Sequence, residues 1–171
     1  MAAFELAISA VLKNEGGLVN NPADNGGITN YGISLNFYKT IKPDAVAADI
    51  KLLTRDMAVA IYRKEFWDKN KYNMIASQKI AGKVFDLAVN MGALNANKCL
   101  QRAILAASGR DVGQDGILGP NTLYAVNYAE PASLYAALKS EAAGHYRLIF
   151  QAQPQEKVFL KGWLNRAYSD V

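Results

Sequence analysis

The sequence predicts a mainly α-helical protein with a small β-hairpin or ordered loop after its first helix. In most of the chain, apolar residues recur every three to four positions, the spacing of one buried helix face. Residues 16–34 are the exception, because six glycines and prolines there argue against a long helix. With 51% of its 171 residues apolar, the chain can bury a sizeable core in one domain.

The helix boundaries follow from this periodicity and from end signals. The first helix covers residues 2–14, and Gly16 and Gly17 tolerate the left-handed conformation that ends a helix. Two short strands, at 18–19 and 28–31, are expected around the turn that separates them. One or two short helices are expected within 34–50 and another short one at 120–128, with longer helices at 55–67, 79–91, 96–107, 131–153 and 156–168.

Composition excludes several classes of protein. A single cysteine rules out an internal disulfide framework, and with one histidine a His/Cys zinc cluster is nearly excluded. We expect no metal and no cofactor. The net charge of +4 suits an anionic polymer, although it is also ordinary for a soluble protein. The charges form no clear stripe, so we do not expect nucleic-acid binding.

The first residues do not read as a targeting or membrane segment. They lack a cationic start and a long apolar run, and they include Glu5. No other stretch is long and apolar enough to span a bilayer, so stable membrane insertion is not expected.

Residues 15–33 contain the best candidates for chemistry. Glu15 is expected in the last turn of the first helix, at its carbonyl end, where the partial negative charge raises the pKa of a carboxyl group. A raised pKa suits a general acid that protonates the leaving oxygen of a glycosidic bond. Asp24 and Thr29 are candidates for holding the attacking water. The alternative is a solvated helix end followed by an ordinary turn.

Further residues are candidates for sugar contact. The amides of Asn20 and Asn30 suit sugar hydroxyl and N-acetyl groups, and Tyr31 could stack on a sugar ring. Asp86 and Asn90 are four residues apart, so they share one face of the helix at 79–91. They either line the cleft beneath the sugar or form a partly buried polar pair.

The stretch from Glu15 to Ile33 resembles the signature of glycoside hydrolase family 108, Glu-Gly-Gly-x-x-Asn-x-Pro-x-Asp-x-Gly-Gly-x-Thr-x-x-Gly-Ile, and meets every fixed position. The resemblance implies a lysozyme-like fold, N-acetylmuramidase activity and Glu15 as the catalytic acid. The order Glu, Asp, Thr is also similar to that of T4-type phage lysozymes. Four residues rather than five separate Asp24 from Thr29, which makes the role of Thr29 less certain.

The second half resembles the peptidoglycan-binding segment that accompanies this family. The matching stretches are 85–92, 100–101, 115–122 and 162–166. The resemblance implies a catalytic segment at 1–88 and a helical binding segment at 89–171, packed into one globule. The stretch at 115–122 also has a plain structural use, because its glycines and proline set a turn and a helix start.

The resemblance implies a monomeric phage-type endolysin that cleaves the β-1,4 bond between N-acetylmuramic acid and N-acetylglucosamine in peptidoglycan, with inversion. It would be made in the cytoplasm without a signal peptide, then reach the wall through a membrane lesion or a dedicated export route. Two alternatives stay open: a lytic transglycosylase that leaves 1,6-anhydro products, and a non-enzymatic wall-binding or secretion-helper protein.

Overall fold

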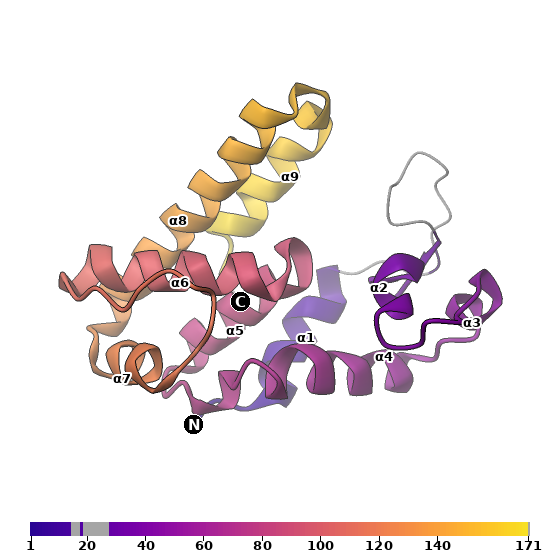
Figure 1. Ribbon diagram of the computed structural model, residues 1–171, viewed down its shortest axis with the longest axis horizontal. Coiled ribbons are helices and arrows are strands. Elements are labelled where there is room, and N and C mark those ends of the chain that lie inside the picture. The colour runs from indigo at the N-terminus through magenta and orange to yellow at the C-terminus, as the bar shows by residue number, and fades with distance from the viewer. Residues whose placement is uncertain (15–17, 19–27, 171) are drawn as a thin grey trace.

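The computed structural model describes residues 1–14, 18 and 28–170, and these form a mostly helical molecule with one two-stranded hairpin (Figure 1). The mainly α fold with a small hairpin after the first helix is confirmed. The elements are α1 (Phe4–Asn14), β1 (Thr29–Asn30), β2 (Ile33–Ser34), α2 (Leu35–Lys39), α3 (Ala47–Lys51), α4 (Arg55–Tyr62), η1 (Arg63–Asp68), η2 (Tyr72–Met74), α5 (Gln78–Met91), α6 (Ala93–Ser108), α7 (Pro120–Tyr128), α8 (Pro131–Ala152), η3 (Pro154–Glu156) and α9 (Lys157–Tyr168).

The hairpin has a different register from the expected one. β1 pairs antiparallel with β2, so the two strands are joined by Tyr31 and Gly32 alone. Both residues have positive φ, 49° and 76°, which is the conformation that a tight two-residue hairpin turn requires. A strand was expected at 18–19, paired with 28–31. Leu18 lies in no strand, so this expectation is wrong at the one residue of 18–19 that the structure describes.

The helix expected at 55–67 changes type partway along. Thr54 caps α4 as its residue type suggests, and its Oγ1 accepts a hydrogen bond from the Met57 N–H at 3.3 Å. After Tyr62 the chain continues as the π-helix η1, which brings Phe66 and Trp67 to the core. A π-helix is a rare insertion that recurs at functional sites.

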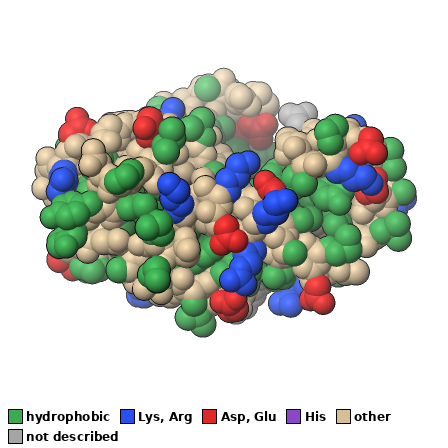
Figure 2. Space-filling view, turned by 60° about the horizontal axis from the view of Figure 1, so that its bottom comes forward, with side chains coloured by type: hydrophobic (Ala, Val, Ile, Leu, Met, Phe, Trp, Pro, Cys, Tyr) green, Lys and Arg blue, Asp and Glu red, His purple; other side chains and the backbone are tan. Residues whose placement is uncertain are grey.

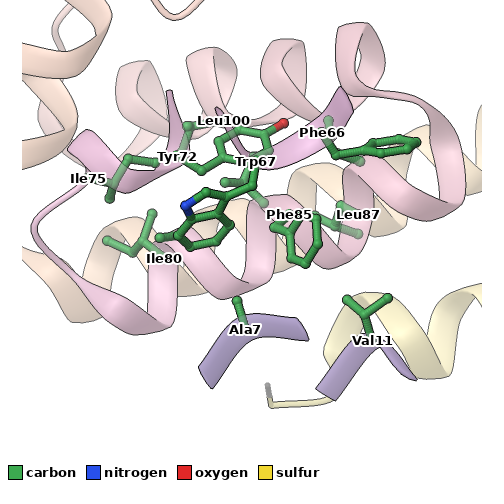
Figure 3. Close-up of a cluster of buried hydrophobic side chains, with 14 of the residues drawn as sticks. Ala7, Val11, Phe66, Trp67, Tyr72, Ile75, Ile80, Phe85, Leu87 and Leu100 are labelled. Carbon is green, nitrogen blue, oxygen red and sulfur yellow. The ribbon is translucent and has the colours of Figure 1, made fainter. Parts of the chain in front are cut away.

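The core is centred on α5, against which α1, η1, α6 and α8 pack. Phe85 of α5 has no exposed surface and meets Trp67 edge-on at 5.4 Å and Phe4 at 5.9 Å between ring centroids. Figure 3 shows the Trp67 indole beside Phe85 of α5, with Ala7 and Val11 of α1 in the same cluster. The first helix and the second half of the chain thus share one core.

Helices α8 and α9 form an antiparallel hairpin that projects from this body (Figure 1). Two fully buried charged residues of α5 hold the end of α9 in place. The ammonium of Lys83 donates to the main-chain oxygens of Arg166 and Ser169. The carboxylate of Asp86 accepts from Nε and Nη2 of Arg166 at 3.1 and 2.9 Å.

The loop between α6 and α7 is organised by Gln101, which is buried. Its side-chain oxygen accepts from the Gly116 N–H at 2.8 Å, and its side-chain nitrogen donates to the Asp115 carboxylate at 2.7 Å. These bonds give the stretch at 115–122 a structural role. None of the helices in the described part of the chain is long and apolar enough to cross a membrane.

Candidate active site

A hollow of about 360 Å³ opens beside the β-hairpin, and we call it the hairpin hollow. Its walls come from the hairpin and α2 on one side and from η1 and the junction of α5 with α6 on the other. The lining residues are Gly32, Ile33, Ser34, Phe37, Thr40, Tyr62, Glu65, Phe66, Lys69, Asn70, Ala88, Val89, Gly92 and Ala93.

Two anchors fix the hairpin at the edge of this hollow. The side-chain nitrogen of Asn30 donates to the main-chain oxygens of Ile50 and Leu53, at 3.0 and 3.3 Å, which fastens β1 to α3. The phenol of Tyr62 donates to the main-chain oxygen of Tyr31 at 3.0 Å, which fastens the turn to α4. The hairpin is therefore held at both its strand and its turn.

The opposite wall carries charge. Glu65 lies in the π-helix, and its side chain is 18% exposed. Its carboxylate lies 3.6 Å from the Lys69 ammonium, which also lines the hollow, and 3.9 Å from that of Lys64. Next to this pair, the rings of Phe66 and Phe37 meet at 5.1 Å between centroids. The hollow thus offers an acidic acceptor, a cation and aromatic surface, a combination suited to a polar ligand with apolar faces.

The predicted catalytic residues are only partly described. Glu15, Asp24 and the predicted sugar contact Asn20 lie outside the described residues. α1 is described as far as Asn14, the residue before Glu15. Thr29 lies in β1 directly opposite Ser34, and Ser34 lines the hairpin hollow.

The predicted sugar contacts fall in two places. Asn30 is 6% exposed and bonded to α3, and Tyr31 is partly buried against the core, so both support the hairpin. Asp86 and Asn90 do share one side of α5, but that side faces the α8–α9 hairpin. Asp86 has no exposed surface and binds Arg166, whereas Asn90 accepts a hydrogen bond from Tyr146 at 2.6 Å. Direct sugar contact by these residues stays a prediction.

Sequence analysis did not single out four polar residues that line the hairpin hollow: Ser34, Glu65, Lys69 and Asn70. Glu65 and Lys69 have the i, i+4 spacing of an ordinary surface ion pair, so nothing local sets them apart. A π-helix leaves no recognisable pattern in a single sequence. Among the residues the structure describes, no group of three or more His, Cys, Asp or Glu could hold a metal ion.

The chain matches two family models in sequence. One, described as glycosyl hydrolase 108, covers residues 8–92, and the other, described as a predicted peptidoglycan domain, covers residues 95–168. The predicted division into 1–88 and 89–171 stays a prediction, and α5 runs across that position. The second match supports peptidoglycan as a partner of this chain.

A solved structure of SagA from Brucella abortus is similar to this protein over nearly its whole length. The two chains are 30% identical in sequence, with a TM-score of 0.81 over 96% of this chain and 88% of that one. No match was found among proteins with curated functional descriptions. The signature from Glu15 to Ile33, the two family matches and this likeness agree, and the chain belongs to the glycosyl hydrolase 108 family.

Proposed function

We propose that this protein is a muramidase, which hydrolyses the β-1,4 bond between N-acetylmuramic acid and N-acetylglucosamine in peptidoglycan. The observation that carries the proposal is the anchored hairpin. It directly follows the Glu15–Asp24 stretch in sequence, contains Thr29 and forms one wall of the hairpin hollow. Both family matches support a glycosidase that acts on peptidoglycan.

In the proposed mechanism Glu15 protonates the leaving oxygen. This role requires a carboxyl group that keeps its proton near neutral pH, which is the property that the sequence predicts for a glutamate at the carbonyl end of a helix. Asp24 and Thr29 position and activate a water on the other face of the sugar, and attack by that water gives inversion. Glu65, Lys69 and the aromatic rings hold the glycan strand in the hollow.

The test is Glu15→Gln, assayed by the reducing ends released from purified peptidoglycan. The glutamine has the same shape but no proton to give, so the rate should fall at least a hundredfold, the usual contribution of general acid catalysis. Glu5→Gln is the matched control. Glu5 lies on α1 in an exposed ion pair with Arg63 and should be dispensable. Unchanged activity in Glu15→Gln would remove Glu15 from the mechanism.

Mass spectrometry of the digest separates the proposal from a lytic transglycosylase. Hydrolysis leaves reducing N-acetylmuramic acid ends, whereas a transglycosylase leaves 1,6-anhydro ends. A non-enzymatic wall-binding protein would release neither product, although it would still sediment with peptidoglycan. In this proposal the protein acts on the cell wall after release through a membrane lesion or a dedicated export route.

A further inference from the structure

A second hollow, of about 410 Å³, lies where α9 meets the end of α5, and we call it the α9 hollow. Among the described residues, none lines both this hollow and the hairpin hollow. The lining residues are Asn90 of α5, Gly162, Trp163, Asn165 and Arg166 of α9, and Ser169.

The two hollows open from neighbouring positions on α5. Val89 lines the hairpin hollow and Asn90 lines the α9 hollow. Successive residues of an α-helix point about 100° apart, so the two hollows open on adjacent sides of α5. Asn90 belongs to the part of the chain that matches the glycosyl hydrolase family, and Trp163 to the part that matches the peptidoglycan domain. The α9 hollow is thus built by both parts.

The aromatic part of the α9 hollow is fixed in place. Trp163 is partly buried, and its ring lies nearly parallel to that of Tyr146, at 5.4 Å and 18°. Phe159, one turn earlier on α9, lies 5.9 Å from Trp163 between ring centroids. A large, rigid aromatic side chain offers apolar contact area at little cost in conformational entropy. This suits the apolar face of a sugar ring.

The polar part of the hollow is also fixed. The side-chain oxygen of Asn90 accepts from the Tyr146 phenol at 2.6 Å, and this bond orients the amide so that its nitrogen remains as a donor. Within the described part of the chain, the Asn165 side chain makes no hydrogen bond, and it is exposed. Two amides beside an aromatic ring match the acetamido group and the ring of an N-acetylated sugar.

The charge in the hollow is already compensated. Of the lining residues that the structure describes, Arg166 is the cation, and its guanidinium is paired with the buried carboxylate of Asp86. A neutral acceptor such as an acetamido carbonyl therefore fits this hollow better than the carboxylates of a peptide. The glycan rather than the stem peptide is the part of peptidoglycan that matches.

We propose that the α9 hollow is a second glycan site, which binds N-acetylated sugars of the same peptidoglycan strand that is cleaved at the hairpin hollow. The inference rests on the proposed muramidase function for its substrate class. It assigns wall-binding contacts to Trp163 and Asn165 in the part that matches the peptidoglycan domain, and to Asn90 in the part that matches the glycosyl hydrolase family. The two halves then form one continuous binding surface.

Tryptophan fluorescence tests the proposal without any need for cleavage. The protein has two tryptophans, of which Trp67 is 2% exposed in the core and Trp163 is partly exposed. Titration with an oligosaccharide of N-acetylglucosamine should give a saturable change in emission that disappears in Trp163→Phe. Asn90→Ala should raise the dissociation constant about tenfold, in line with the loss of a well-placed hydrogen bond. Asn121 is an exposed asparagine on α7, and Asn121→Ala should leave the dissociation constant unchanged.

Three outcomes would overturn the proposal. These are a change in emission that persists in Trp163→Phe, equal affinities for Asn90→Ala and Asn121→Ala, and a response to a free stem tetrapeptide but not to the oligosaccharide. The muramidase function is judged separately, by product release from the wild type and from Glu15→Gln. If that function holds, Asn90→Ala should raise KM for long glycan strands and leave kcat unchanged.

Discussion

The phenol of Tyr62 donates a hydrogen bond to the main-chain oxygen of Tyr31 and so ties the tip of the β-hairpin to the end of α4, at 3.0 Å. Tyr31 has φ of 49°, a conformation that residues other than glycine rarely adopt and that the surrounding structure must hold in place. Tyr62 is 1% exposed, so its hydroxyl meets the hairpin inside the core. The shape of the hairpin hollow depends on this contact.

Replacement of Tyr62 by phenylalanine should therefore affect activity more than stability. Loss of one buried hydrogen bond costs about 1 kcal/mol of folding free energy, a shift of a few degrees in Tm for a chain of this size. The hairpin turn would move, and product release from peptidoglycan should fall several-fold. Tyr128→Phe, at a residue that is 75% exposed on α7, is the control. Wild-type activity in Tyr62→Phe would show that the hairpin needs no such anchor.

Glu65→Gln tests whether the charged wall of the hairpin hollow contacts substrate. The amide keeps the shape of the side chain but is a weaker acceptor for sugar hydroxyls, because hydrogen bonds to charged groups are stronger. We expect kcat/KM on peptidoglycan to fall about tenfold. Lys64→Met is the matched control, because Lys64 lies 3.9 Å from the same carboxylate but its side chain is 81% exposed. Equal losses in the two variants would point to the ion pair rather than to substrate contact.

The sequence predicted those helices and helix ends that depend on a few neighbouring residues. The apolar repeat of α5 and the cap at Thr54 each depend on a few neighbouring residues. The register of the hairpin was missed because Tyr31 adopts a left-handed conformation that its residue type does not suggest. The placement of Glu65 was missed because it depends on the change from α-helix to π-helix after Tyr62. The sequence leaves Asp86 open between a cleft residue and a buried polar residue, because its partner, Arg166, lies eighty residues away.

Gly116 should be far less replaceable than its neighbour Gly113. Both have positive φ, 78° and 76°. A Cβ atom at Gly116 would lie 2.5 Å from Cδ1 and 2.9 Å from the main-chain oxygen of Leu94, whereas one at Gly113 would meet nothing within 4 Å. Gly113→Ala should cost about 1 kcal/mol from backbone strain alone. Gly116→Ala adds a clash with backbone and should cost about 3 kcal/mol. Urea denaturation measures both, and equal losses would contradict the steric argument.

Lys83 gives the α5–α9 junction a specific pH dependence. The residue has no exposed surface, and burial lowers the pKa of its ammonium from 10.5 to about 8. Nearby Asp86 acts in the opposite direction but does not cancel the effect. Between these two pKa values the unfolded chain holds more protons than the folded chain. The contribution of Lys83 to the free energy of unfolding should therefore rise as the pH increases from 8 to 10.5.

Lys83→Met removes this titration and keeps a side chain of similar length. The difference in the free energy of unfolding between wild type and Lys83→Met should therefore shift in favour of the wild type across that pH range. The shift should be at most about 3.5 kcal/mol, since one pKa unit corresponds to about 1.4 kcal/mol. Urea denaturation at several pH values measures it, with Lys79→Met as the control because Lys79 is exposed on the same helix. A difference that stays constant across the range would mean that Lys83 does not titrate in the folded protein as its burial demands.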